Sequence, residues 1–276
     1  MVKGKGMDMK IALIQSYVDK DVNKNIENMA IQLSQCKEAD IVLLPEMWTV
    51  PYENKAMKAS IVYQSEAMDL LQKMSHQNHQ RIIGGTMAEK AGSSIYNTCF
   101  VYDKGQLVTS YRKMHLMHFH GRIDYTEADV FRPGDQFCVV DHMGILVCYD
   151  IRFCEQARIL AQHGAKILFV PAAFNQSVGK AHWDILCRTR ALENEVFLCA
   201  VNPAYTYQNY TSYGHSMIVD PNGQKIMEMD EKPGIAMADI DLSQIDRIRQ
   251  RMPFWQIRRT DLYTCKEKEN EMDRME

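Results

Sequence analysis

The stretch GILVCYDIRF, residues 144–153, decides how this sequence folds. Its apolar run at 145–147 ends in Cys148 and is followed at once by polar side chains. A short run that is apolar at every position is typical of a strand whose two faces are both covered, as in parallel sheets. The stretch therefore predicts a buried strand that closes on Cys148 and delivers its thiol to the polar edge of a sheet.

Similar apolar runs recur along the chain, and stretches with helical spacing lie between them. The runs are KIALIQS (10–16), DIVLLPE (40–46), RIIGGTMAE (81–89), AKILFVPAA (165–173) and VFLCAVN (196–202). Apolar residues fall on one helical face within 26–36 and within 183–191. The turn signals DKG (103–105) and DPNG (220–223) each separate two apolar segments and predict hairpins. This alternation predicts an α/β chain with antiparallel pairs added to a layered sheet.

The organisation of the chain predicts one domain. No internal repeat or low-complexity linker divides the sequence, so we expect a single domain over residues 9–264. Residues 1–8 form a short N-terminal extension, and the mixed charge run 265–276 is expected to be a solvated tail.

The composition of the chain indicates which kinds of partner and which cellular location to expect. The chain has 276 residues, with 32 basic against 35 acidic side chains and a net charge of −3, and it lacks a basic stripe interleaved with aromatics. Nucleic acid is therefore not expected as a partner, and a small-molecule substrate is expected instead. The opening MVKGKGMDMK does not resemble a secretory signal, and no apolar run is long enough to span a bilayer, so a cytoplasmic location with no membrane contact is expected. The eight cysteines contain no C-x-x-C pair and are expected to be reduced thiols.

Two ionisable residues stand where apolar runs end, and a third follows a hairpin strand. Glu46 closes DIVLLPE much as Cys148 closes GILVC, and Lys113 follows the second strand of the DKG hairpin, where its ammonium is expected to be partly desolvated. Ligands of open α/β sheets meet the protein at strand ends. Each residue also has an ordinary interpretation: Glu46 as a surface or capping carboxylate, Lys113 as an exposed lysine with a buried stem, and Cys148 as a core thiol like Cys99 or Cys199.

Taken together, these three side chains suit one kind of chemistry. Hydrolysis of an unactivated amide needs a nucleophile, a base that takes its proton and passes it to the departing ammonia, and a positive or N–H group that holds the oxyanion. Cysteine, glutamate and lysine can fill these roles. The residues alone therefore favour a thiol-dependent amide hydrolase.

The segments that contain these residues resemble a known family. LLPEMW (43–48), RKMHL (112–116) and LVCYDIRF (146–153) are similar, in order and spacing, to the three signature segments of the nitrilase superfamily of carbon–nitrogen hydrolases. The resemblance extends from KIALIQ to RRTDLY (258–263), and residues 172–204 are most similar to its ω-amidase branch. It implies a four-layer α-β-β-α sandwich that forms homodimers or larger homo-oligomers.

The resemblance also implies a role for each matching residue. Cys148 becomes the nucleophile, Glu46 the general base and Lys113 the oxyanion stabiliser, with the backbone N–H of Tyr149 as a second oxyanion donor. Glu127 matches a further carboxylate that orients the lysine or the attacking water. The implied reaction proceeds through a Cys thioester and needs no metal or organic cofactor.

The substrate pocket is expected around the residues that follow two of the strands. Arg152 is a candidate for binding a substrate carboxylate, because a guanidinium binds carboxylates bidentately, and a structural ion pair of Arg152 is an equally open alternative. Pocket shape is expected to come from strand ends and the loop after them, at Tyr149, Ala173, Phe174 and NQSVGK (175–180). Lys180, Ala172 and the segment MHFHGRIDY (117–125) depart from the usual ω-amidase pattern.

Rival constellations have less support. The spacing of His115, His118 and His120 could suggest a zinc site, but no further ligand has matching spacing, and His115 belongs to the family motif, where it is not a ligand. His182 could partner a papain-like cysteine, although no spacing supports it. GHSMI (214–218) lacks the second glycine of the serine-hydrolase elbow.

The sequence thus predicts a linear-amide hydrolase, with ω-amides of 2-oxo acids (2-oxoglutaramate and 2-oxosuccinamate) as its expected substrates. The alternatives are an amidohydrolase of N-carbamoyl compounds or another aliphatic amidase with the same three residues, a nitrilase, and a non-catalytic module that has kept the fold for binding.

Overall fold

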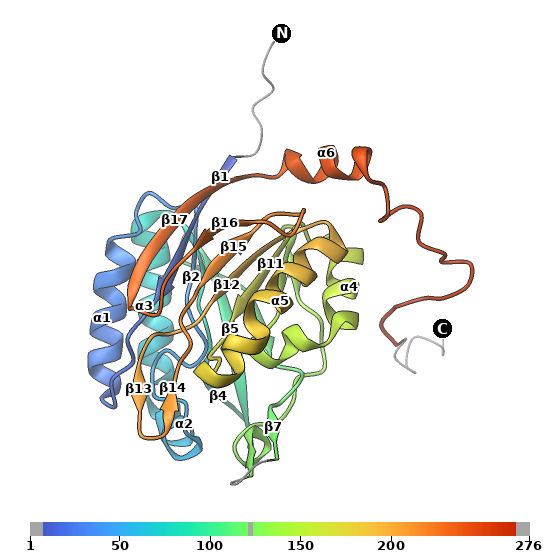
Figure 1. Cartoon of the computed structure of the whole chain (residues 1–276). Helices are drawn as coiled ribbons and strands as arrows, with labels where there is room; N and C mark the ends of the chain where they lie inside the picture. The colour runs from blue at the N-terminus through green and yellow to red at the C-terminus, as the bar shows by residue number, and fades with distance from the viewer. Residues whose placement is uncertain (1–7, 121–123, 269–276) are drawn as a thin grey trace, which may run out of the picture.

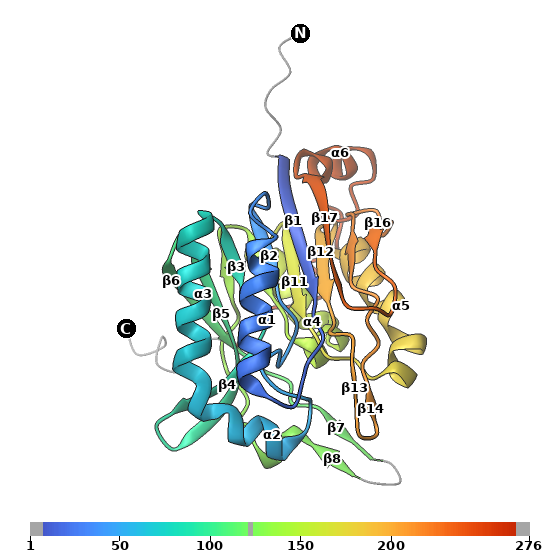
Figure 2. The same ribbon diagram turned by 90° about the vertical axis from the view of Figure 1, so that its left-hand side faces the viewer.

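Two β-sheets pack face to face in the computed structural model, which describes residues 8–120 and 124–268, and helices cover the outer face of each sheet. Figure 1 shows α1 and α3 on one side of the sheets and α4 and α5 on the other. Figure 2 looks onto α1 and α3, with the first sheet behind them. The layers are therefore α-β-β-α, and the predicted fold class is confirmed.

The first sheet contains the N-terminal strands and the long C-terminal strand. Its order is β17 (Gly234–Asp241), β1 (Asp8–Gln15), β2 (Ile41–Leu43), β3 (Arg81–Ile83), β5 (Ser94–Asp103) and β4 (Met87–Ala91), with β6 (Gln106–Arg112) also paired to β5. Strands β1, β2 and β3 are parallel to one another, and the remaining pairs are antiparallel.

The second sheet contains the strand of the opening stretch. Its order is β16 (Lys225–Glu228), β15 (Met217–Val219), β12 (Phe197–Val201), β11 (Ile167–Pro171), β10 (Met143–Ile145) and β9 (Val139–Val140). Strands β10, β11 and β12 are parallel, so their carboxyl ends lie at one edge.

Two pairs of helices form the outer layers, and short elements connect the rest. Helices α1 (Val22–Ser34) and α3 (Gln64–Asn78) pack on the first sheet, and α4 (Cys154–Gln162) and α5 (Gln176–Asn194) pack on the second. The remaining elements are α2 (Asn54–Ala59), α6 (Ser243–Arg251), the 3-10 helices η1 (Ser60–Tyr63), η2 (Glu127–Asp129) and η3 (Cys148–Arg152), and the two-residue strands β7 (His118–Phe119), β8 (Tyr125–Thr126), β13 (Thr206–Tyr207) and β14 (Tyr210–Thr211).

Alternation along the strands explains why the apolar runs have no polar side. In β1, Ile11 and Leu13 join the core between the sheets, whereas Ala12 and Ile14 face the helices α1 and α3. Successive side chains of a strand point to opposite faces, and here both faces are covered. Every position therefore needs an apolar residue.

The predicted elements are confirmed, with three differences. The strand within DIVLLPE ends at Leu43, so Glu46 does not close it. RIIGGTMAE forms two strands, β3 and β4, because the chain turns at Gly85, where φ is +59° and an added Cβ would lie 2.1 Å from the carbonyl oxygen of Pro45. The strand of the opening stretch ends at Ile145, so Cys148 does not close it but begins η3. Apolar residues continue to Val147 because this connection is buried as deeply as the strand itself.

The cysteines, the helices and the chain ends bear on three further predictions made from the sequence. All eight cysteines are free thiols. Among the described residues, no helix is both long and apolar enough to cross a bilayer. Residues 1–7 of the predicted extension and 269–276 of the predicted tail lie outside the described residues.

Candidate active site

Glu46 lies three residues beyond β2, at the contact between the two sheets. Its backbone N–H donates to the carbonyl of Ala172, which follows β11 of the other sheet, at 3.3 Å. The residue is 1% exposed. The next residue, Met47, has a φ of 51° and donates its N–H to Oγ1 of Thr86 at 3.0 Å. The turn after β2 therefore places a carboxylate deep inside the protein.

Lys113 meets two carboxylates at this point. Its backbone N–H donates to the carbonyl of Asn97 on β5 at 2.9 Å, and its Nζ donates to Oε1 of Glu46 and to Oε2 of Glu127, each at 2.8 Å. All three ionised side chains are completely buried. The sequence predicted only partial desolvation of Lys113, whereas the structure buries it fully.

Glu127 is held at the start of η2 by both backbone and side-chain contacts. Its N–H donates to the carbonyl of Met117 at 3.0 Å, and the N–H of Met117 donates back to Oε2. The hydroxyl of Tyr52 donates to Oε1 at 2.8 Å. Glu127 is thus a fixed second partner of Lys113.

Cys148 begins η3 with a φ of 47°, in the left-handed region that non-glycine residues seldom occupy. Such a conformation costs about 1–3 kcal/mol and persists where the surroundings enforce it. Buried Asp150 does so: its Oδ2 accepts from the N–H of Val147 at 2.9 Å and from the hydroxyl of Tyr111 at 2.7 Å. Its Oδ1 accepts from the N–H of His115 at 2.9 Å.

The electrostatics of the group favour a neutral thiol beside an ion pair. Burial and the nearby Glu46 raise the pKa of Cys148, although Lys113 and a hydrogen bond from the N–H of Ala173 act in the opposite direction. Burial and the charge of Glu127 raise the pKa of Glu46 above its usual 4.5 against the attraction of Lys113. Burial lowers the pKa of Lys113, but the two carboxylates outweigh it and hold that pKa well above 10.5. Lys113 is therefore an ammonium at any working pH.

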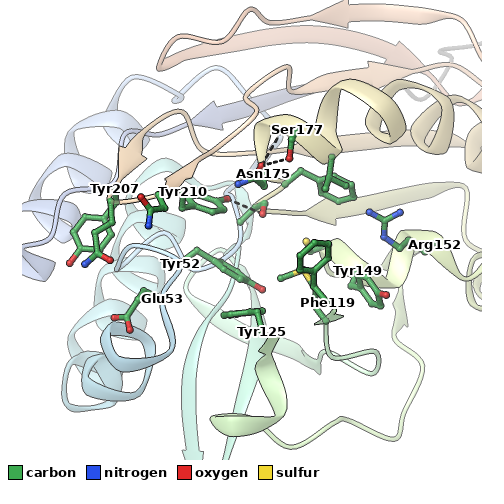
Figure 3. Close-up of a pocket in the computed structure, with 17 residues that line it drawn as sticks. Tyr52, Glu53, Phe119, Tyr125, Tyr149, Arg152, Asn175, Ser177, Tyr207 and Tyr210 are labelled. Carbon is green, nitrogen blue, oxygen red and sulfur yellow. Dashed lines mark hydrogen bonds between the residues drawn. The ribbon is translucent and has the colours of Figure 1, made fainter. Parts of the chain in front are cut away.

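A pocket of about 440 Å³ opens over Cys148. Figure 3 shows aromatic rings around it, with Tyr149 and Arg152 toward one end and Glu53 and Tyr207 toward the other. Most of its wall comes from aromatic and aliphatic side chains, from the loops around η3, the start of α5 and the β13–β14 hairpin. A pocket of this size takes a small organic molecule.

The residues predicted for substrate binding line this pocket. Tyr149, Arg152, Ala173 and Phe174 all contribute to its wall. The Arg152 guanidinium lies 5.3 Å from the centroid of the Tyr149 ring and 5.2 Å from that of Phe174. Its Nη1 lies 3.2 Å from Nδ1 of His182, and within residues 8–120 and 124–268 it makes no ion pair with a carboxylate. The geometry therefore does not show the ion pair that the sequence left open for Arg152.

The rival constellations do not assemble. Nδ1 of His115 lies 2.8 Å from Oδ1 of Asp150, and the exposed His182 contacts Arg152 rather than Cys148. In the described part of the chain, no three His, Cys, Asp or Glu side chains lie close enough together to hold a metal ion.

Three buried polar residues of the site had no predicted role. Asn97 and Tyr52 donate to the carboxylates, and Asp150 fixes the backbone at Cys148. Asp150 lies within LVCYDIRF, two residues after Cys148, and a polar side chain in so apolar a segment is the signal that the sequence offers for it. Asn97, beside the equally buried Thr98 on β5, and Tyr52 have no such signal.

Comparison with known proteins agrees with this arrangement. The carbon–nitrogen hydrolase family profile matches residues 10–250, and the chain belongs to that family. It is 36% identical to "Omega-amidase NIT2-B" of Xenopus laevis, over 95% of this chain and 99% of the relative, and 36% identical to "Nitrilase homolog 2" of Dictyostelium discoideum, over 92% and 81%. The crystal structure of Nit3 of Saccharomyces cerevisiae, a member of branch 10 of the nitrilase superfamily, superposes with a TM-score of 0.83 at 31% identity, over 91% of this chain and 97% of that one. The resemblance to the nitrilase superfamily is confirmed.

Proposed function

We propose that this carbon–nitrogen hydrolase acts on small linear ω-amides of 2-oxo acids, 2-oxoglutaramate and 2-oxosuccinamate, and releases the 2-oxo acid and ammonia. The observation that carries the proposal is the buried group in which Nζ of Lys113 lies 2.8 Å from both Glu46 and Glu127, next to Cys148 at the pocket. Membership of the family makes the chain an enzyme that cleaves amide carbon–nitrogen bonds, so the non-catalytic module is no longer an alternative.

Acylation begins with transfer of the thiol proton. Glu46 takes the proton of Cys148, the sulfur forms a bond to the amide carbon, and the carbonyl oxygen becomes an oxyanion. Lys113 and the N–H of Tyr149 stabilise that charge. Such stabilisation lowers the barrier by several kcal/mol in a site that excludes water. Glu127 holds Lys113 in place, because its carboxylate accepts from Nζ and is itself fixed by Met117 and Tyr52.

Ammonia leaves when the carbon–nitrogen bond breaks and the nitrogen takes the proton from Glu46. The product of this half-reaction is a Cys148 thioester. A water molecule then loses a proton to Glu46 and attacks the thioester carbon. The carbon–sulfur bond breaks, and the sulfur of Cys148 takes that proton back from Glu46. The raised pKa of Glu46 suits this repeated exchange, because a base acts best when its pKa is near the working pH.

The substrate class is supported by the pocket and by the relatives. Of the described residues that line the pocket, Arg152 is the only lysine or arginine, and it is free of carboxylates there. It is therefore suited to bind the distal carboxylate of a 2-oxo acid amide. Relatives named ω-amidases match over nearly their whole length.

Ammonia release from a panel of compounds tests the proposal. The panel is 2-oxoglutaramate, 2-oxosuccinamate, N-carbamoyl-β-alanine, glutamine and a simple nitrile, each assayed with the intact enzyme and with Cys148→Ala. We expect the two 2-oxo acid amides to have the highest kcat/KM. Turnover confined to the carbamoyl compound would replace the proposal with the alternative amidohydrolase, and turnover confined to the nitrile would make the enzyme a nitrilase.

We also propose that the enzyme is a cytoplasmic homodimer or larger homo-oligomer with one structural domain over residues 9–264. Light scattering at several protein concentrations would give the mass, and a monomer at micromolar concentration would contradict the oligomer.

A further inference from the structure

The two oxygens of Glu46 have different surroundings. Oε1 accepts from Nζ of Lys113 at 2.8 Å, from Nδ2 of Asn97 at 2.8 Å and, more weakly, from the hydroxyl of Tyr52 at 3.4 Å. Oε2 has no partner of ordinary hydrogen-bond geometry among the described residues, and the thiol of Cys148 interacts with the Glu46 carboxyl group at this point. A carboxylate oxygen that already accepts two close hydrogen bonds is a poor place for a further proton, because the donors stabilise its charged form.

Asn97 is held in the site by three hydrogen bonds, one of its backbone and two of its side chain. Its backbone carbonyl accepts the N–H of Lys113 at 2.9 Å, and its side-chain Nδ2 reaches Oε1 of Glu46 and, at 3.4 Å, Oε1 of Glu127. The side chain is completely buried on β5. Its amide group must present nitrogen to the carboxylates, since the opposite orientation would place its oxygen against two negative charges.

Tyr52 contacts the same two carboxylate oxygens as Asn97, Oε1 of Glu127 and Oε1 of Glu46. Its hydroxyl donates to Oε1 of Glu127 at 2.8 Å and approaches Oε1 of Glu46. Burial and the two carboxylates raise the pKa of Tyr52 well above 10, so the hydroxyl keeps its proton and remains a donor.

We infer that Asn97 and Tyr52 are positioning residues that hold Oε1 of Glu46 as an acceptor and leave Oε2 as the oxygen that moves protons in the reaction. In acylation the S–H bond of Cys148 breaks and an O–H bond forms at Oε2. The same proton goes to the leaving nitrogen as the carbon–nitrogen bond breaks. Neither positioning residue exchanges a proton with the substrate. This inference deepens the proposed function, because it assigns the path of the proton at the same site.

Alkylation of Cys148 by iodoacetamide tests the inference without any amide substrate. The rate of modification of the Cys148 peptide, followed by mass spectrometry against pH, reports the ease with which Glu46 takes the thiol proton. Other charged or titratable groups also face Glu46 and influence its pKa, so each variant changes one residue and leaves these groups as they are. The groups are Lys113, Glu127, Cys148, Tyr52, Tyr125, Tyr205 and Tyr210.

Asn97→Leu removes the donor but keeps the volume, and Asn97→Asp keeps the shape but replaces the donor with an acceptor. Both should move the acid limb of the alkylation profile to higher pH, by about half a unit or more for Asn97→Leu, because a hydrogen bond to the charged form of Glu46 is lost. On any amide that the enzyme turns over, we expect kcat to fall by about ten- to a hundredfold with KM within about threefold, as for a transition-state effect.

The matched control is Thr98→Val, on the next position of β5, whose hydroxyl contacts Glu89 and not the site. It should leave the alkylation profile unchanged. Tyr52→Phe is the second variant if Asn97→Leu does not fold, since it removes only the hydroxyl, and it should shift the limb in the same direction. The inference is overturned if the folded Asn97 and Tyr52 variants have the wild-type profile, or if Asn97→Asp behaves as wild type. A shifted profile in an enzyme that releases no ammonia from the panel would instead support the inference and refute the proposed function.

Discussion

Nζ of Lys113 lies 2.8 Å from Oε1 of Glu46, and neither side chain is exposed to solvent. Glu46 follows a strand of the first sheet at residue 43, and Lys113 follows another at residue 112. Burial of an ammonium is costly unless opposite charge is close, and here two carboxyl groups lie within hydrogen-bond distance of one ammonium.

Replacement of the nucleophile should stop turnover. We expect Cys148→Ala to lower kcat by about 10⁵-fold or more, because the other groups cannot form the thioester. Cys99→Ala is the matched control: Cys99 is equally buried, in the core between the sheets, and its loss should leave ammonia release close to wild type. Near-normal activity of Cys148→Ala would refute the assignment of the nucleophile.

Loss of the shared ammonium should affect stability as well as rate. Lys113→Met leaves two buried carboxylates without a cation, so we expect a loss of about 3–5 kcal/mol in the free energy of unfolding. Adding Glu127→Gln should recover part of that stability, because only one carboxylate then remains. Both proteins should be inactive to within the assay limit. Chemical denaturation measures the first effect, and a double variant no more stable than Lys113→Met would contradict it.

The acid limb of kcat/KM should lie above pH 4.5. The pKa of Glu46 is raised by burial and by the charge of Glu127, and the carboxylate must be ionised to accept the thiol proton. Activity is therefore lost as pH falls through a raised pKa. Glu127→Gln removes one cause of the shift, so the limb should move to lower pH while kcat falls. Glu193→Gln, on α5 and paired with Arg190, should leave the limb in place.

Arg152 should matter only for anionic substrates. Arg152→Met is expected to raise KM for 2-oxoglutaramate by about tenfold or more, since a charge-assisted pair contributes about 1.5–3 kcal/mol. The same variant should leave KM for a neutral aliphatic amide unchanged. Lys180→Met removes an exposed charge outside the pocket lining and should change neither value. Equal effects of Arg152→Met on both substrates would show that its role is structural.

Asp150 should stabilise the turn at the nucleophile. Asp150→Asn keeps the shape but has one acceptor oxygen for the buried donors of Val147, Tyr111 and His115. At least one donor would lose its partner, at a cost of about 1–3 kcal/mol. Thermal unfolding should show the loss. An unchanged melting temperature with lowered kcat would show that Asp150 acts on the reaction and not on the stability of the turn.

The sequence alone predicted those parts of the fold and site that local patterns encode. Continuous apolar runs such as 10–16 mark strands covered on both faces, and Glu46 and Cys148 stand out because each follows such a run, whereas Lys113 follows a hairpin strand of mixed polarity. The end of β10 could not be predicted, because Val147 is as buried in the turn as Ile145 is in the strand.

The contacts within the site could not be predicted from the sequence for a different reason. Asn97 and Glu46 are 51 positions apart, and Tyr52 and Glu127 are 75 apart. Only the packing of β5, η2 and the turn after β2 brings them together. No rule of residue spacing along the chain predicts contacts between residues so far apart in sequence.

The positions of the three proposed catalytic residues in the two sheets determine when activity can appear during folding. Glu46 and Lys113 follow strands of one sheet, whereas Cys148 follows β10 of the other, and the Glu46 turn touches Ala172 across the boundary. Neither sheet contains a complete set of reacting groups. The proposed nucleophile and its base therefore come together only when the two sheets pack against each other, so a chain whose sheets have not docked cannot carry out the reaction.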